Sequence, residues 1–337
     1  MNYLRTNSRY CASLLCIILF SAACSSAVRR SEPTDLVWPP PPSQPRIKYI
    51  QSIYTEDDIG RTYSLKETLF GKDYDDTLKR PYSVFASRGS ILITDIGAKF
   101  VQVLDLAAKR MSVVGGDGSL RYPVAAVSDA SGAIYVADVG NAKVMVYDGN
   151  GRYRTSYAVD NGKPVALAIN ERLGTLYVVD RQQHRVIALD KQGQQLFTFG
   201  SFGDSNGNFN VPLAIAIGAD DKLYVLDSGN FRVQVFDARG AYLFKFGSVG
   251  DRAGLFANPK GVALDSAGHI YVTDAAFSNF QIFDQQGNVL LYVGSMGPAP
   301  GQMHLPGGIA IDDQDRIYVA DQLNRRIEVF QYLKDTP

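Results

Sequence analysis

Short apolar runs alternate with polar turns along most of this chain, and one pair of such runs occurs six times. The clearest copy is Leu223–Asp237, LYVLDSGNFRVQVFD, in which two apolar runs flank a polar turn that begins at Asp227. β-Branched and aromatic residues in runs this short favour a β-hairpin over a helix. The other copies are ILITDIGAKFVQVLD, IYVADVGNAKVMVYD, LYVVDRQQHRVIALD, IYVTDAAFSNFQIFD and IYVADQLNRRIEVFQ.

The Asp that ends the first run of each copy sets the period of the repeat. It stands at positions 95, 138, 180, 227, 274 and 321, so that successive copies are 42 to 47 residues apart. Each period has room for four short strands, which in the fourth repeat are expected at Leu213–Ile217, Leu223–Leu226, Arg232–Phe236 and Tyr242–Phe246. Four strands in each period of roughly 40–50 residues predict an all-β fold, a six-bladed β-propeller of four-stranded blades over residues 81–334.

The sixth repeat ends after its third expected strand, Arg326–Tyr332, and has no fourth strand of its own. Residues 46–54 precede the first repeat and resemble fourth strands such as Val289–Val293. We therefore predict that residues 46–54 pair with the third strand of the sixth repeat and close the ring. Closure would remove sheet edges that otherwise promote aggregation.

Residues 55–80 form an insertion, because the other entries into a blade are shorter. We expect it on the face that carries the turns after the repeated Asp. Within it, Ser64–Phe70 is predicted to form a short helix with Leu65 and Leu69 on one side, ended by Gly71. The insertion could plug the channel mouth or brace the ring, or it could act as a docking element or lid.

The first 23 residues have the pattern of a signal peptide: a basic start, the apolar run Cys11–Phe20, and small residues before Cys24. The apolar run is too short to span a bilayer, which needs roughly 20 residues. The stretch Ser21–Cys24 resembles the bacterial lipobox, although Ser21 stands where Leu is preferred. The resemblance implies lipid attachment at Cys24; the alternative is simple cleavage and a free Cys24.

Cys24 would be the single cysteine of the mature chain, so no disulfide could form within it. In bacterial lipoproteins a Ser at the position of Ser25 implies transport to the outer membrane. Residues 24–45 are Pro-rich and predict an extended polyproline tether that lifts the domain off the membrane, with a ligand for a Pro-binding partner as the alternative. The predicted location is therefore the bacterial cell envelope, with a lipid anchor in the outer membrane.

The chain has balanced charge, with 34 basic and 34 acidic residues, and removal of residues 1–23 would leave it at −2. A nucleic-acid-binding protein usually carries a dense basic stripe, which this balance does not provide. No P-loop and no dinucleotide-binding fingerprint occurs either. We therefore expect no nucleic-acid partner and no cofactor.

Two stretches, PLAIAIGADDKLYVLDSGNFRVQVFD and PGGIAIDDQDRIYVADQLNRRIEVFQ, carry a shared pattern: Pro-x-x-hydrophobic-Ala, then hydrophobic-Tyr-Val-x-Asp, then Asn-x-Arg. This pattern resembles the NHL repeat and recurs over about residues 81–332. The resemblance implies a six-bladed propeller, and the whole layout resembles bacterial NHL lipoproteins. RNA binding, known in tripartite-motif relatives, conflicts with export and with the neutral charge.

A basic residue stands five positions after the repeated Asp in four of the blades. We expect surface ion pairs there that fix the hairpin turn, each contributing about 0–1 kcal/mol. Phe100 and Asn279 replace the basic residue in the first and fifth repeats. The predicted pairs are Asp138 with Lys143, Asp180 with Arg185, Asp227 with Arg232, and Asp321 with Arg326.

The residue after each strand-entry Pro is expected to border the central channel. Amidating lyases share the propeller fold and hold zinc with histidines at these entries, whereas lactonase-like propellers bind calcium there through acids and amides. Neither a histidine nor an acid occurs in this row, and His269 is expected on the opposite face, so no metal is predicted. The acidic run at residues 312–315 is expected to be solvated. The channel row is Tyr82, Val124, Val165, Leu213, Lys260 and Gly307.

A weakly basic, aromatic rim is the candidate binding site, suited to an anionic peptide or sugar. The predicted function is a monomeric, lipid-anchored envelope scaffold that binds a protein, peptide or glycan. The alternative is an envelope hydrolase or lyase with its site at the channel mouth, although no Gly-x-Ser-x-Gly elbow occurs. The candidate residues are Tyr82, Arg121, Lys163, Lys260, Phe277 and His304.

Overall fold

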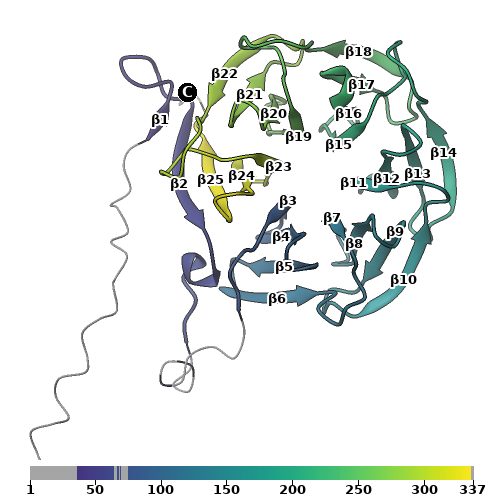
Figure 1. Cartoon of the computed structure of the whole chain (residues 1–337), viewed down its shortest axis with the longest axis horizontal. Helices are drawn as coiled ribbons and strands as arrows, with labels where there is room; N and C mark the ends of the chain where they lie inside the picture. The colour runs from purple at the N-terminus through teal and green to yellow at the C-terminus, as the bar shows by residue number, and fades with distance from the viewer. Residues whose placement is uncertain (1–35, 64–66, 68, 70–74, 335–337) are drawn as a thin grey trace, which may run out of the picture. The chain divides into compact units, whose positions relative to one another are not determined.

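The computed structural model describes residues 36–63, 67, 69 and 75–334. Over these residues it contains six antiparallel sheets arranged as blades around a centre (Figure 1). The predicted signal peptide, Cys24 and most of the predicted Ser64–Phe70 helix lie outside the described residues. The prediction of an all-β six-bladed propeller is confirmed.

Each of blades 1 to 5 contains four strands that follow one another in the chain and in the sheet. Blade 1 is β3 (Pro81–Ser87), β4 (Ser90–Asp95), β5 (Phe100–Asp105) and β6 (Arg110–Val114); blade 2 is β7 (Pro123–Ser128), β8 (Ile134–Asp138), β9 (Lys143–Tyr147) and β10 (Tyr153–Ala158); blade 3 is β11 (Pro164–Asn170), β12 (Thr175–Asp180), β13 (Arg185–Leu189) and β14 (Gln195–Phe199). Blade 4 is β15 (Pro212–Ile217), β16 (Leu223–Asp227), β17 (Arg232–Phe236) and β18 (Tyr242–Phe246); blade 5 is β19 (Pro259–Leu264), β20 (Ile270–Asp274), β21 (Asn279–Phe283) and β22 (Val289–Val293).

Blade 6 is closed by the N-terminal part of the described chain. Its own strands are β23 (Pro306–Ile311), β24 (Arg316–Asp321) and β25 (Arg326–Tyr332), and β2 (Ile47–Ile53) pairs antiparallel with β25. Ile53 stands opposite Ile327 and Ile47 opposite Tyr332 in this pairing. Both isoleucines of β2 are buried, so closure adds apolar burial to the backbone hydrogen bonds. The predicted closing strand is confirmed.

Residues 36–45 contain a short strand that adds to blade 6 and an exposed loop that leads from it into β2 (Figure 1). The short strand β1 (Val37–Trp38) pairs with β2, and the amide of Arg46 donates to the carbonyl of Trp38 at 2.7 Å. The Trp38 ring meets Phe330 edge-to-face, with centroids 5.8 Å apart. The indole packs against the sheet and the chain reverses direction between Trp38 and Arg46, whereas the prediction for residues 24–45 is an extended tether.

The described part of the insertion packs at the outer side of blade 1. A 3-10 helix, Glu56–Ile59, begins with a capping box made by Thr55 and Asp58. Buried Glu56 accepts a hydrogen bond at 3.3 Å from the amide of Met111 in β6. This contact supports the bracing alternative. No described residue of the insertion lines the central cavity.

Buried tyrosines between the blades carry their hydroxyls to carboxylates in the turns between first and second strands. Tyr318 donates to Asp312 at 3.0 Å, and the amide of Ser266 donates to Asp315 at 2.8 Å. Both carboxylates are buried, while Asp313 is exposed. The expectation that the whole acidic run is solvated is thus wrong, because Asp312 is held by Arg316 and Tyr318 of its own blade and Asp315 by Ser266 of blade 5.

Among the described residues no helix combines the length and the apolar character that crossing a bilayer requires.

Candidate functional site

The repeated Asp of each blade is fully buried and holds the loop that enters the innermost strand. In blade 2, Asp138 accepts hydrogen bonds from the backbone amides of Arg121 at 2.7 Å and Tyr122 at 2.9 Å. The same carboxylate accepts from the amide of Gly140 in the following turn at 2.9 Å. Bonds to backbone amides explain why the Asp is present in all six blades whether or not a basic residue follows it. The equivalent entry-loop donors are Lys79, Lys163, Asn210, Ala257 and His304.

Three of the four predicted pairs form ion pairs, between Asp180 and Arg185 at 3.2 Å, Asp227 and Arg232 at 2.8 Å, and Asp321 and Arg326 at 3.0 Å. They are not surface pairs. The side chains of Arg232 and Arg326 are 6% and 1% exposed, and each guanidinium also donates to three carbonyls of its entry loop.

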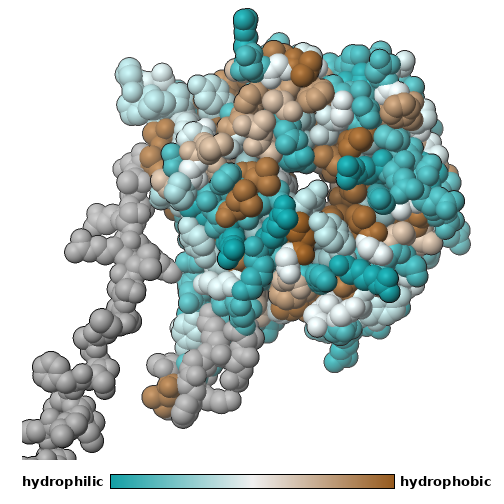
Figure 2. Space-filling view, in the orientation of Figure 1, coloured by the Kyte–Doolittle hydropathy of each residue, from teal (hydrophilic) through white to brown (hydrophobic). Residues whose placement is uncertain are grey.

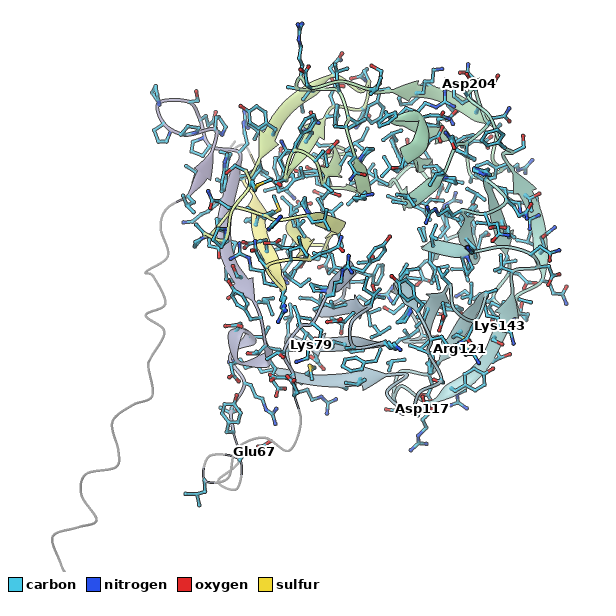
Figure 3. The ribbon with its side chains drawn as sticks, viewed as in Figure 1. Glu67, Lys79, Asp117, Arg121, Lys143 and Asp204 are labelled. Atoms are coloured by element: carbon cyan, nitrogen blue, oxygen red, sulfur yellow. The ribbon has the colours of Figure 1, made fainter. Side chains whose placement is uncertain are left out.

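The fourth predicted pair differs from the other three. Lys143 stands opposite Asp138 in the strand register, but its side chain is exposed and no ion pair joins the two within the described chain. Figure 3 shows Lys143 and Arg121 at the same side of the ring. Lysine lacks the planar fork with which arginine reaches several acceptors at once, so it does not replace arginine here.

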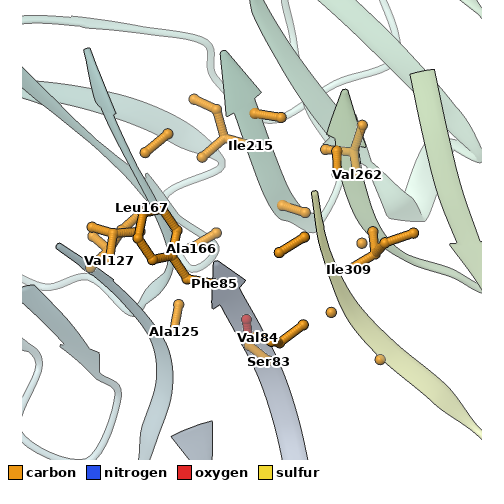
Figure 4. A pocket seen from close by; sticks show the side chains of 18 of the residues that line it. Ser83, Val84, Phe85, Ala125, Val127, Ala166, Leu167, Ile215, Val262 and Ile309 are labelled. Atoms are coloured by element: carbon orange, nitrogen blue, oxygen red, sulfur yellow. The ribbon is translucent and has the colours of Figure 1, made fainter. Parts of the chain in front are cut away.

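The centre of the ring encloses a cavity of about 260 Å³, lined by the six innermost strands. All six residues of the predicted channel row line it, and most of the remaining lining side chains are aliphatic (Figure 4). Each innermost strand ends its sheet and has no strand partner on the channel side. The cavity therefore combines apolar side chains with backbone N–H and C=O groups that the sheets leave unpaired.

The next position along each innermost strand holds a small residue in every blade. A β-carbon on Gly308 would lie 2.8 Å from the Cα of Ser83, so neighbouring strands meet too closely for a larger residue. This row was not singled out in the sequence, although its small size is visible there. It consists of Ser83, Ala125, Ala166, Ala214, Gly261 and Gly308.

Lys260 and Tyr82 both line this cavity, each at the first position after the Pro that begins its innermost strand. Burial, followed by the positive charge of Arg181, lowers the pKa of Lys260. Burial raises the pKa of Tyr82, and the same Arg181 charge opposes that rise. Arg181 belongs to blade 3, while Tyr82 and Lys260 belong to blades 1 and 5, so three alternate blades contribute to one mouth.

Gln322 is, beside Arg181, the second residue at the channel mouth that was not predicted from the sequence. It is 4% exposed, lines the cavity, and lies against Gly307, whose added β-carbon would be 2.9 Å from the Gln322 amide nitrogen. Arg181 and Gln322 both follow the repeated Asp. The sequence signal was available, because the other blades have a small or apolar residue at this position: Ile96, Val139, Ser228 and Ala275.

The other predicted rim residues lie outside the cavity lining. Arg121, Lys163 and His304 are exposed on entry loops, and Phe277 is half-buried in the turn after Asp274. Arg121 instead borders a separate, exposed hollow beside the Gly-rich loop between blades 1 and 2. The structure therefore brings together two of the six predicted site residues, Tyr82 and Lys260.

His269 lies in the turn between β19 and β20, where its ring is 2.8 Å from Asp265. The part of the chain that the structure describes contains no group of three or more His, Cys, Asp or Glu side chains suited to holding a metal ion.

Figure 2 shows apolar residues near the centre of one face, among hydrophilic residues toward the rim.

The NHL repeat model matches residues 209–236 and 256–283, which run through the first three strands of blades 4 and 5. The chain is a six-bladed β-propeller with NHL repeats in its fourth and fifth blades. The match includes blade 5 although Asn279 replaces the basic residue there, and it includes blade 4, which has the full pattern. A comparison with curated proteins returns no match.

Solved structures share the fold of this NHL-repeat propeller. Virginiamycin B lyase from Staphylococcus aureus is 11% identical over 86% of this chain and 100% of its own, with a TM-score of 0.57. An auxiliary nutrient binding protein from Bacteroides thetaiotaomicron is 13% identical over 77% and 71%, with a TM-score of 0.61. A gluconolactonase from Xanthomonas campestris is 15% identical over 76% and 88%, with a TM-score of 0.58. Identities this low show a common fold, which hosts both enzymes and binding proteins.

Proposed function

We propose that this protein is a lipid-anchored scaffold of the bacterial cell envelope, which binds a ligand or partner on the face where the entry loops meet the channel. The signal-like first 23 residues and Cys24 support export and anchoring. The closed ring supports the scaffold, since rigid blades hold loops at fixed positions and loops commonly carry binding.

The observation that carries the proposal is the composition of the channel mouth. Lys260 and Tyr82 face a cavity with mainly aliphatic side chains, and no carboxylate or histidine lines it. A site of this kind can hold a ligand through charge and hydrogen bonds. Among the described residues that line the cavity there is no histidine or carboxylate to serve as a base for the alternative hydrolase or lyase.

Affinity capture from solubilised envelopes tests the proposal. The lipidated protein is used as bait beside two charge-reversal variants, Lys163→Glu on the entry-loop face and Arg239→Glu in the turn between β17 and β18 on the other face. Both side chains are exposed, so both variants should fold. We expect a bound component that survives Arg239→Glu and is lost or reduced with Lys163→Glu. Equal capture by both variants would contradict a binding role for the entry-loop face.

A further inference from the structure

The side chain of Gln322 places a primary amide in the lining of the central cavity, beside Gly307 at the channel mouth. The side chain is 4% exposed. A primary amide has two donors and an acceptor. An amide in this position is therefore suited to a ligand that offers both an acceptor and a donor, as a hydroxyl does.

Positive charge without a matching carboxylate gathers at the same mouth. Lys260 lines the cavity, and the charge of Arg181 acts on it and on Tyr82. No ion pair joins Lys260 or Arg181 to an acid within the described chain. The one acid that acts on Lys260 is Asp274, whose two oxygens already accept from the backbone amides of Ala257 and Asn258.

The neighbouring groups favour a small, hydroxyl-rich anion over a simple one. The Tyr82 hydroxyl, which burial keeps protonated, can donate to a carboxylate. The free edges of the innermost strands offer backbone donors and acceptors for several hydroxyls. A cavity of about 260 Å³ admits a molecule of monosaccharide size and excludes a folded partner.

We infer that the channel mouth binds a sugar acid, with its carboxylate at Lys260, Arg181 and the Tyr82 hydroxyl and its hydroxyls at Gln322 and the inner strand edges. The inference rests on the proposed binding function and names the class of ligand for it. Gly307 has a direct part, because a β-carbon there would lie 2.5 Å from the Tyr82 carbonyl oxygen and 2.9 Å from the Gln322 amide nitrogen, so that only glycine lets these two groups come this close.

Titration calorimetry with glucuronate tests the inference, with glucose and inorganic phosphate as the neutral and the hydroxyl-free comparisons. We expect glucuronate to bind at least tenfold more tightly than either. Glucose lacks the carboxylate, and phosphate lacks the sugar hydroxyls. Equal binding of phosphate would mean a site for any small anion and would overturn the sugar-acid assignment. No binding of glucuronate would overturn it as well. Capture of an envelope component that depends on the entry-loop face would still stand in that case, so the two failures are distinguishable.

A matched pair of lysine variants locates the site. Lys260→Met removes the charge at the mouth and keeps the length of the side chain, whereas Lys245→Met removes an exposed charge on the outer strand β18. We expect Lys260→Met to weaken glucuronate binding by about tenfold to a hundredfold, the effect of losing one charge-assisted hydrogen bond. Lys245→Met should bind as the unaltered protein does; equal affinities for all three proteins would overturn the placement.

Nuclear magnetic resonance of the lysine side chains gives a reading that does not depend on a variant. Burial and Arg181 lower the pKa of Lys260 in the free protein, and a bound carboxylate favours the charged ammonium. Saturating glucuronate should therefore raise the pKa of this one lysine. An unchanged titration of Lys260 in the presence of bound glucuronate would place the ligand elsewhere.

Discussion

At the scale of single residues, the position seven residues after the repeated Asp holds glutamine in blade 4 and glutamate in blade 6, and the two side chains differ in their hydrogen bonds. Gln234 in blade 4 donates to the carbonyl of Asn208 at 2.7 Å and accepts from the amide of Gly207 at 2.9 Å. Blade 6 has Glu328 there, which is fully buried and is an acceptor only while ionised. It accepts from Ser52 of the closing strand at 2.9 Å and lies 2.6 Å from the Arg326 guanidinium.

Glu328 makes the stability of the ring dependent on pH. Burial raises its pKa to about 8, against the attraction of Arg326 and the Ser52 hydrogen bond, and the nearby charge of Asp321 adds to the rise. The folded protein thus holds a proton that the unfolded chain releases near the ordinary value of 4.5. The stabilising contribution is complete below about pH 4.5 and is lost as pH rises to about 8.

We therefore expect Glu328→Gln to flatten the loss of stability between about pH 5 and pH 8. Glutamine fits beside an arginine, as Gln234 beside Arg232 shows. Urea unfolding of both proteins across this range measures the effect. Parallel slopes of unfolding free energy against pH would show that Glu328 is not the group responsible.

Two of the arginines that follow the repeated Asp should differ strongly in their effect on stability. Arg232→Met would take the charged partner from buried Asp227 and the guanidinium donor from three loop carbonyls, at a cost of about 3–5 kcal/mol. Arg185→Met removes one bond of a side chain that is 29% exposed and should cost about 0–1 kcal/mol. Chemical denaturation of both variants measures the difference. Similar losses of unfolding free energy in the two variants would mean that burial of the Asp–Arg pair does not add to its contribution to stability.

At the scale of elements, the closing strand β2 joins residues more than 270 positions apart in sequence. It supplies the partner of β25 and buries Ile47, Tyr49 and Ile53. The hydrogen bond from Ser52 to Glu328 and the bond from Arg326 to the Tyr54 hydroxyl at 2.9 Å fix its position further. The last blade depends on this strand in a way that no other blade depends on a distant segment.

Deleting residues 46–54 should abolish cooperative thermal unfolding, because β25 would become an exposed edge and the three buried side chains would be lost. Calorimetry and light scattering measure the change. Trp38→Ala serves as the milder comparison, since it removes the β1 contact with Phe330 and keeps β2. A deletion variant that melts cooperatively at the original temperature would refute the closing role.

At the scale of the whole molecule, the blades form one ring and the proposed lipid anchor joins it to a membrane. In this proposal different segments of the chain serve location and binding. The anchor at Cys24 precedes the ring, and the binding face is formed by the entry loops of the ring. A change at Cys24 should alter location without altering the propeller.

Replacing Cys24 with Ser should move the protein from the membrane fraction to the soluble fraction, since a serine cannot form the thioether to lipid. Membrane fractionation and mass spectrometry of the N-terminal peptide measure this. Far-ultraviolet circular dichroism and the melting temperature should stay unchanged. Retention of the variant in the membrane fraction would argue against a lipid anchor at Cys24.

The repeat by itself determined the six blades, their four strands and the closing strand, because a period of 42 to 47 residues with short β-rich runs admits few other folds. It also placed Tyr82 and Lys260 at the channel, since both follow the strand-entry Pro. Only the tertiary structure decided that the Asp pairs are buried, that Val37 and Trp38 pair with the closing strand, and that Arg181 and Gln322 join the mouth. These depend on which surfaces neighbouring blades cover, and a local pattern along one strand contains no information about what packs against it.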